Sequence, residues 1–92
     1  MKFTVQVARS AAKTLDTLDK PTHRRVWAKI RALADVPRPH GAKALTHGLK
    51  GLYRVRVGQY RVVYRVVDAE SLVRVTRIGT RSSIYDDAER AE

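Results

Sequence analysis

The chain has 92 residues and contains no cysteine. A disulfide scaffold and thiolate chemistry are therefore excluded. No apolar run is long enough to cross a bilayer, and the N-terminal run MKFTVQVARSA, which Gln6 and Arg9 interrupt, is too short for a signal peptide. The length of the chain predicts a single domain over residues 1–92. The absence of a membrane span and of a signal peptide predicts the cytoplasm as its compartment.

Acidic residues are scarce. The chain has nine Asp and Glu against 19 Lys and Arg, which gives a formal net charge of +10. Four of the nine acids fall in the last seven residues, DDAERAE, so residues 86–92 are expected to form a short acidic tail. Such a charge predicts a polyanionic partner, which leaves nucleic acid, an anionic membrane surface or an acidic protein.

Histidine is also rare. The three histidines have no metal-ligand spacing, so they are expected at the surface and no metal or cofactor is predicted. The chain likewise lacks the paired Glu and His of free ribonucleases.

Residues 51–85 show the most regular pattern in the chain. Apolar and basic residues alternate at the strand period in 52–57 and again in 59–67, which predicts a sheet with one hydrophobic face and one basic face. A row of arginines in an arbitrary basic domain is more often a solvated surface than a site. The arginines on the predicted basic face are Arg54, Arg56, Arg61 and Arg65.

The N-terminal half predicts one strand and a helical hairpin. Alternation over residues 3–8 indicates a strand with one buried face. Ser10 is a candidate N-cap for a short helix that ends near Asp19, and Pro21 suits the first turn of a second helix that Pro37 terminates. Trp27 falls on the apolar stripe of that second helix and is expected in the core.

The C-terminal half predicts three consecutive antiparallel strands. Residues 38–51 are expected to form a loop, and two short connections, Gly58–Gln59 and 68–71, join the strands. Ile78 is out of phase with the preceding valines in the alternation of this strand. A bulge near Thr76 and Arg77 would restore the alternation. The predicted fold is α+β, a four-stranded antiparallel sheet with the helical hairpin packed on one face.

The ordered pattern resembles a known family. The runs AKALTHGLKGLYRVRVGQYRVVYRV and VTRIGTRSSIY are similar to those of the RelE/ParE superfamily of toxins from bacterial type II toxin–antitoxin modules, and specifically its RelE branch. The resemblance implies a small ribonuclease-like fold that enters the ribosomal A site, cleaves messenger RNA without a metal, and is silenced by a cognate acidic antitoxin. It favours a binding site over a solvated surface for the arginine row.

The resemblance also implies site residues. Arg61, Arg81 and Tyr85 take the catalytic positions, and Arg54 and Arg56 take positions that contact RNA. Some relatives have lysines where this chain has Arg54 and Arg56, and commonly a lysine or histidine where it has Thr80. The residues expected to bind RNA are Lys43, Lys50, Arg54, Arg56 and Arg65.

Cleavage by the 2′-hydroxyl needs a base, stabilisation of the phosphorane and an acid. Guanidinium groups suit the charge stabilisation, but they cannot transfer protons. Tyr85 is the leading base because neighbouring cations favour phenolate. Lys43, Lys50, His40 and His47 remain alternatives, and the acid is not assigned.

Two other functions stay open. One is a gyrase-directed toxin of the ParE branch, which has no nuclease chemistry. The other is an inactive homologue that binds nucleic acid or antitoxin only.

Overall fold

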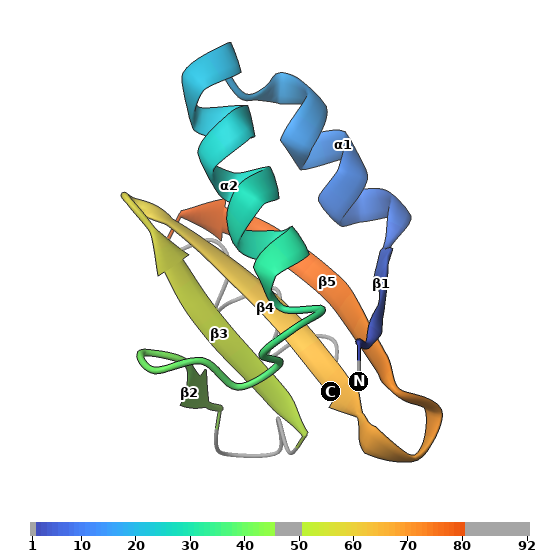
Figure 1. The fold of residues 1–92 in the computed structure, drawn as a ribbon. Coiled ribbons are helices and arrows are strands. Elements are labelled where there is room, and N and C mark those ends of the chain that lie inside the picture. Colours follow the sequence, from blue (N-terminus) through green and yellow to red (C-terminus); the bar gives the residue numbers. More distant parts are fainter. Residues whose placement is uncertain (1, 46–50, 81–92) are drawn as a thin grey trace.

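The structure, a computed structural model, describes residues 2–45 and 51–80. Two helices lie across one face of a five-stranded sheet, which confirms the predicted α+β class (Figure 1). No helix within the described residues is long and apolar enough to span a membrane. In chain order the elements are β1 (Thr4–Val7), α1 (Arg9–Thr17), α2 (Lys20–Ala32), β2 (Lys43–Ala44), β3 (Leu52–Val57), β4 (Tyr60–Val67), the 3-10 turn η1 (Asp68–Glu70) and β5 (Leu72–Thr80).

The sheet differs from the predicted four-stranded antiparallel sheet in two respects. Its order is β1-β5-β4-β3-β2, and β1 runs parallel to β5 while the other pairs are antiparallel. Both helices follow β1 before the chain returns to the sheet, and such a helical crossover permits a parallel neighbour. The strand β2, inside the predicted loop 38–51, has only two residues and therefore shows no periodicity to detect.

The helices bury one stripe each against the sheet. Ala11 and Leu15 of α1 are buried, as are Val26 and Ile30 of α2 and Leu33 directly after it. These positions recur at three- and four-residue intervals, as an amphipathic helix requires. The sheet residues buried in the same core are Val55, Val62, Tyr64, Val73, Val75 and Ile78.

Helix α2 begins as predicted, whereas α1 does not. Asp19 caps α2 by accepting a hydrogen bond from the Thr22 amide, and Pro21 lies in the first turn. Helix α1 starts at Arg9 after Ala8, which has no side-chain cap, so the predicted N-cap role of Ser10 is wrong. Ser10 Oγ instead donates to the Thr76 carbonyl at 3.3 Å.

The predicted connections and bulge are confirmed. Strands β3 and β4 are joined by Gly58 and Gln59, with Gly58 at φ +58°, the conformation that the first position of a type II′ turn needs. On β5, Arg77 pairs with Val63 and Val75 pairs with Tyr64, so Thr76 is the extra residue of a bulge. The bulge returns Ile78 to the core side of the sheet.

Candidate nucleic-acid interface

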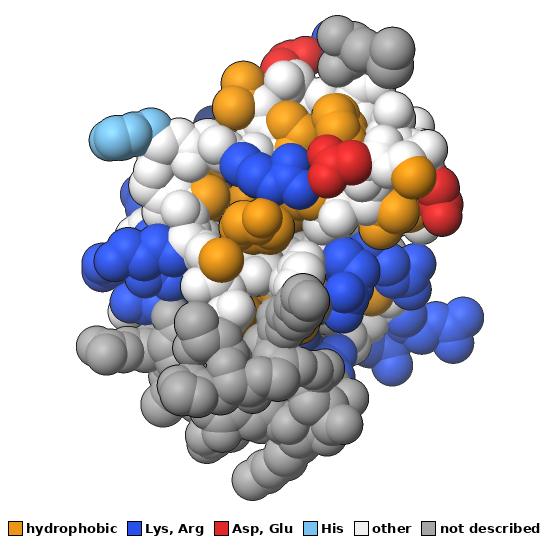
Figure 2. Space-filling view, turned by 90° about the horizontal axis from the view of Figure 1, so that it is seen from below, with side chains coloured by type: hydrophobic (Ala, Val, Ile, Leu, Met, Phe, Trp, Pro, Cys, Tyr) orange, Lys and Arg blue, Asp and Glu red, His pale blue; other side chains and the backbone are white. Residues whose placement is uncertain are grey.

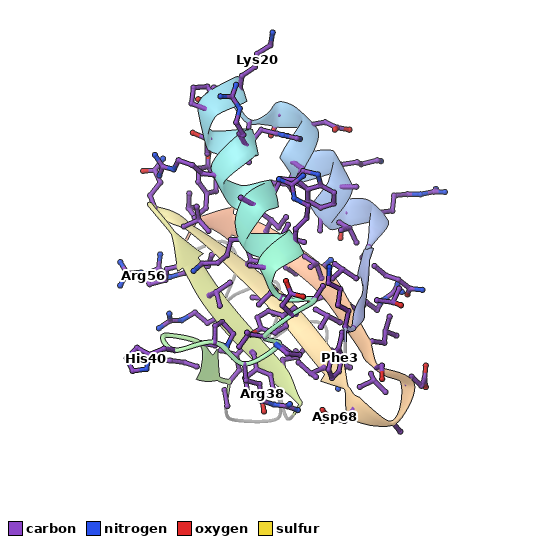
Figure 3. The ribbon with its side chains drawn as sticks, viewed as in Figure 1. Phe3, Lys20, Arg38, His40, Arg56 and Asp68 are labelled. Carbon is purple, nitrogen blue, oxygen red and sulfur yellow. The ribbon has the colours of Figure 1, made fainter. Side chains whose placement is uncertain are left out.

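The face of the sheet opposite the helices, here called the outer face, is rich in arginine. Side chains alternate along each strand, so the residues between the core positions of β3, β4 and β5 point to this face. In Figure 3 the side chain of Arg56 projects from β3 away from the body of the molecule. The arginines of this face are Arg54, Arg56, Arg61, Arg65, Arg74 and Arg77.

Strand register aligns these cations in three rows across the sheet. Neighbouring rows are two residues apart along a strand, or ~7 Å. Each row holds two arginines, and the middle row adds a lysine. The rows contain Arg56, Arg61 and Gly79; Lys43, Arg54, Val63 and Arg77; and Leu52, Arg65, Arg74 and Gln6.

Three pairs of like charges lie directly opposite each other in this register. They are Arg56 with Arg61, Arg65 with Arg74, and Lys43 with Arg54. Directly opposed like charges destabilise a sheet. The five strands themselves contain no Asp or Glu. A polyanion bound on this face would therefore meet a dense positive charge.

Arg61 differs from the other arginines in its burial. It is only 7% exposed, although it bears a permanent charge. Its Nη1 donates a long hydrogen bond of 3.5 Å to the Gln59 carbonyl, and its Nε has no partner within residues 2–45 and 51–80. A buried cation with an unused donor is costly to a fold. A phosphate oxygen would supply the missing acceptor.

Arg77 lies at the bulge, next to the N-terminus of α1. Its Nη1 donates to Ser10 Oγ at 2.7 Å and to the Thr76 carbonyl at 3.4 Å. Its Nε is buried and, in the described part of the chain, also lacks a partner. Val63, between Arg54 and Arg77 in the middle row, is fully buried. The centre of the outer face is thus shielded from water, where charge–charge interactions are stronger than at an exposed surface.

The other predicted RNA-binding residues surround this centre. Lys43 and Arg56 are exposed, whereas Arg54 and Arg65 are half-buried. The Arg65 guanidinium lies against Gly51, where a Cβ would approach its Nη1 to 2.8 Å. Gly51 has φ +87°, which favours glycine there, whereas the end of the flexible Arg65 side chain could move aside for a Cβ.

Several predicted residues lie outside the described part of the chain. They are Lys50, Arg81 and Tyr85, together with His47 and the acidic tail 86–92. Their expected roles therefore remain predictions. His40 is described and exposed, in the loop before β2 (Figure 3).

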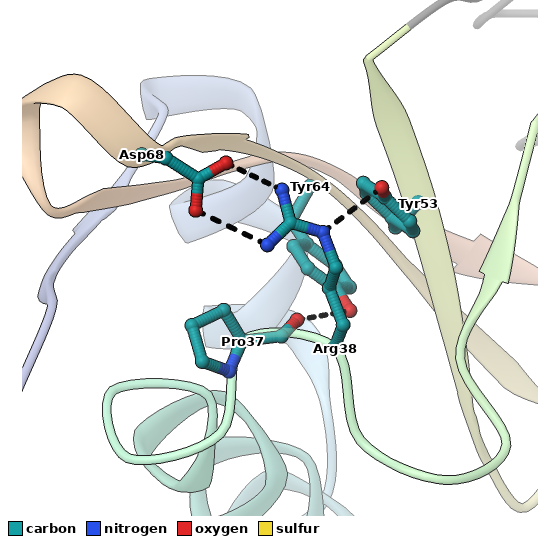
Figure 4. Close-up of polar contacts among 5 residues, drawn as sticks. All are labelled: Pro37, Arg38, Tyr53, Tyr64 and Asp68. Carbon is teal, nitrogen blue, oxygen red and sulfur yellow. Dashed lines mark hydrogen bonds and ion pairs between the residues drawn. The ribbon is translucent and has the colours of Figure 1, made fainter.

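A second polar cluster, here called the Arg38 clamp, holds that loop in place (Figure 4). Arg38 donates from Nη1 and Nη2 to the two carboxylate oxygens of Asp68, at 3.2 and 2.7 Å, and from Nε to Tyr53 Oη at 2.9 Å. The Tyr64 hydroxyl donates to the Pro37 carbonyl at 2.7 Å, and the rings of Tyr53 and Tyr64 stack with centroids 5.9 Å apart. The clamp fixes the chain that leads into β2 and Lys43.

The clamp shifts the ionisation of its members. The hydrogen bonds from Arg38 hold the pKa of the Asp68 carboxyl below its usual value, and the same contacts raise the pKa of Arg38. Burial raises the pKa of Tyr64 to about 12. The three shifts favour the charge states that the geometry requires, an ionised Asp68, a charged Arg38 and a neutral Tyr64.

The sequence did not identify Arg74, Arg77 or the Arg38 clamp. Arg74 could have been found, since it alternates with Val73 and Val75. Arg77 is placed on the outer face only by the bulge, and Arg38 is 30 residues from Asp68, which no local pattern connects. Figure 2, which views the molecule from below, shows Lys and Arg side chains of the described residues on both flanks and, near the middle, a basic side chain beside an acidic one.

Comparisons with known proteins found similar toxins. The family model described as the ParE toxin of type II toxin–antitoxin systems, parDE, matches residues 5–85. A RelE-like toxin protein of Escherichia coli is 29% identical over 90 residues, a match that covers 94% of this chain and 93% of that protein.

Two solved complexes are similar in structure. A chain of the toxin–antitoxin complex RelBE2 from Mycobacterium tuberculosis is 27% identical with a TM-score of 0.78, and the match covers 88% of this chain and 100% of that one. A chain of the archaeal RelE–RelB complex from Pyrococcus horikoshii is also 27% identical with a TM-score of 0.78, covering 89% and 98%.

Proposed function

The chain belongs to the ParE toxin family of type II toxin–antitoxin systems, within the RelE/ParE superfamily, and we propose that it is a ribosome-dependent endoribonuclease that cleaves messenger RNA. The observation that supports this most is the outer face, where three rows of cations include the buried Arg61. Its partners would be messenger RNA on the ribosome and a cognate acidic antitoxin, in the cytoplasm.

In this proposal the 2′-hydroxyl of the message attacks the adjacent phosphate, and the bond to the leaving 5′-oxygen breaks. Arg61 and Arg81 stabilise the negative charge that develops on the phosphorane. Tyr85 accepts the proton of the 2′-hydroxyl. Lys43 and Lys50 contact flanking phosphates, as do the remaining predicted RNA-binding residues Arg54, Arg56 and Arg65.

The composition of the outer face supports the proposed dependence on the ribosome. The described strands supply neither a carboxylate nor an imidazole, the groups with which free ribonucleases move protons. The protein alone therefore binds RNA better than it cleaves it. We expect weak cleavage of naked RNA and strong cleavage of message bound to ribosomes.

Single-turnover cleavage on saturated, programmed ribosomes tests the proposal. Arg61→Ala and Arg81→Ala should each lower the rate ~10²- to 10³-fold, and Tyr85→Phe should lower the rate without changing ribosome binding. Lys43→Ala and Lys50→Ala should weaken binding and leave the saturated rate intact. Lys13→Ala, which removes an exposed charge from α1, is the matched control. Equal cleavage of naked and ribosome-bound RNA would contradict the ribosome dependence.

A gyrase-directed toxin is the second candidate, because the matching family model is described for ParE. The two activities leave different products after induction, since one cuts messenger RNA and the other leaves DNA breaks. DNA breaks with intact message favour this candidate. If neither product appears, the chain is an inactive homologue that only binds.

A further inference from the structure

Strand β2 has few interactions of its own to hold it in the sheet. It consists of Lys43 and Ala44 and lies at the edge, next to β3. The Leu45 amide extends the pairing by one hydrogen bond, to the Leu52 carbonyl at 2.9 Å. Lys43 lies directly opposite Arg54, and like charges in this position destabilise a ladder. A pairing this short is weak, so the placement of Lys43 depends on contacts outside the ladder.

The Arg38 clamp supplies such contacts. In Figure 1 the chain that leaves α2 crosses the lower end of the sheet before it reaches β2, and Figure 3 labels Arg38 in that region. The Arg38 guanidinium donates both hydrogen bonds to Asp68 of η1 and a third to Tyr53 of β3. The adjacent Pro37 carbonyl accepts from Tyr64 of β4 (Figure 4). Two consecutive residues of this segment are therefore attached to two strands and to the turn after them.

Tyr53 connects the clamp to β2. Its ring packs against the core, on the helical side of the sheet, and its register partner on β2 is Ala44. The Arg38 guanidinium carbon lies 5.2 Å from the centre of this ring. The next residue of β3 is Arg54, whose partner is Lys43. Arg38 therefore acts from the helical side on the pair next to the one that places Lys43 on the outer face.

The geometry of the clamp distinguishes it from an ordinary surface ion pair. The side chains of Arg38 and Asp68 are 43% and 62% exposed, and a single ion pair at such a site contributes little to stability. Here the contact is bidentate, and a third donor of the same guanidinium binds Tyr53. A planar fork held at three points fixes the direction of the chain, which the single ammonium group of a lysine does not do.

We propose that Arg38 is a positioning residue for RNA binding. Through the clamp it holds β2 in register, so that Lys43 presents its ammonium group beside Arg54 on the outer face. Arg38 does not contact the RNA, because Asp68 and Tyr53 engage its guanidinium on the helical side. The phosphate contact of Lys43 rests on the proposed function, whereas the hold on β2 rests on the clamp alone.

Hydrogen exchange of the Leu45 amide measures the hold on β2 directly. Its hydrogen bond to Leu52 directly follows the paired residues of β2, so it opens when β2 detaches. Arg38→Lys keeps the charge and loses the fork, so it should speed exchange of this amide about 10-fold or more, while the amides of β4 stay at the wild-type rate. Arg31→Lys, the same change at an exposed arginine of α2, should leave the Leu45 amide unaffected.

Two acids of η1 separate positioning from simple electrostatics. Asp68→Ala breaks the clamp and Glu70→Ala leaves it intact, although each removes one exposed negative charge. If charge alone governed binding, both variants would bind a single-stranded RNA oligonucleotide more tightly than the wild type. Positioning predicts that the Kd of Asp68→Ala rises about 3- to 10-fold, as in Lys43→Ala, and that its slope of log K against log salt concentration falls by about 0.7. Glu70→Ala should bind at least as tightly as the wild type.

The double variant of Asp68→Ala and Lys43→Ala completes a cycle. It should bind RNA no more weakly than Lys43→Ala alone, because the clamp acts through Lys43. Additive losses would show that the clamp supports the fold in general, and tighter binding by Asp68→Ala would show that only its charge matters. Either result overturns the proposal, as does an unchanged exchange rate of the Leu45 amide in Arg38→Lys. Circular dichroism at the assay temperature checks that every variant is folded.

The nuclease proposal fails or stands separately. Asp68→Ala should cleave message at the wild-type rate on saturating ribosomes, since the clamp affects binding and not the chemical step. If the wild type neither binds nor cleaves RNA but Arg38→Lys still frees the Leu45 amide, the proposed function is wrong and the hold on β2 stands. If the wild type cleaves and Asp68→Ala keeps the wild-type Kd, the nuclease stands and Arg38 is not a positioning residue.

Discussion

Val63 and Arg77 face each other across β4 and β5 only because Thr76 bulges out of the ladder between them. Without the bulge, Arg77 would alternate onto the core side with Val73 and Val75. The Thr76 hydroxyl stabilises the bulge by donating to the Val63 carbonyl at 3.2 Å. One inserted residue thus adds a guanidinium to the outer face and keeps Ile78 in the core.

The first prediction concerns Arg77 as a phosphate contact. Arg77→Gln should weaken ribosome and RNA binding and reduce the slope of log K against log salt concentration by about 1, because one counterion fewer is released. Arg9→Gln, which removes an exposed charge from the start of α1, should leave the slope unchanged. The same slope for Arg77→Gln and the wild type would assign Arg77 a purely structural role at Ser10.

The second prediction is that Arg61 lowers the stability of the fold. It is a buried cation whose Nε has no partner among residues 2–45 and 51–80, and a like charge lies opposite it. Arg61→Met, which keeps much of the side-chain length, should raise the free energy of unfolding by roughly 0.5–2 kcal/mol and abolish most cleavage. Urea unfolding measures the first effect.

Arg56→Met is the control for Arg61, because Arg56 is the exposed partner in the same pair. The free energy of unfolding of Arg56→Met should stay within about 0.5 kcal/mol of the wild-type value. A loss of stability in Arg61→Met would mean that Arg61 is satisfied in the free protein, and the phosphate would then not be its missing partner.

The sheet and helices were largely predictable because they follow short-range patterns. The alternation in residues 52–57 and 59–67, the Gly58 turn and the Pro21 start are local features, and each was confirmed. The parallel pairing of β1 with β5 was missed because it joins Thr4 to Leu72, and periodicity within a strand does not determine its neighbour.

The site was predictable only where it coincided with the alternation. Arg54, Arg56, Arg61 and Arg65 were placed on the correct face, but nothing local showed that Arg61 is buried and Arg56 exposed. Burial depends on what packs over a residue, which is a tertiary property. Trp27, which was expected in the core, is only half-buried at its edge, since a helix stripe does not distinguish a fully buried position from a half-buried one.

The third prediction concerns the Arg38 clamp and acid. The pKa of Asp68 is lowered from the usual 3.8 by its hydrogen bonds to Arg38, so the clamp stabilises the fold above that pH. This contribution should fall as the pH drops through 3.8 and vanish below the lowered folded value. Asp68→Asn should therefore be less stable than the wild type at neutral pH, and the difference should disappear in acid.

Urea unfolding of the wild type and Asp68→Asn over this range measures the difference. High salt should also reduce it, because both side chains are partly exposed. A stability difference that is constant with pH would show that it arises from the shape of the amide and that the ionisation of Asp68 contributes nothing.

The last prediction concerns the buried Tyr64 hydroxyl, which donates to the Pro37 carbonyl. Tyr64→Phe removes the hydroxyl and so deprives the Pro37 carbonyl of this hydrogen bond. The free energy of unfolding at neutral pH should therefore fall by roughly 1–3 kcal/mol. Burial raises the pKa of Tyr64 from 10.0 to about 12, so the phenol favours the folded state below pH 10 and this contribution is lost as the pH rises toward 12. The wild type should accordingly lose stability over that interval more steeply than Tyr64→Phe, and the two unfolding curves should converge. Parallel pH profiles of the two proteins would instead show that the hydroxyl ionises as freely as in the unfolded chain, which its hydrogen bond and burial do not allow.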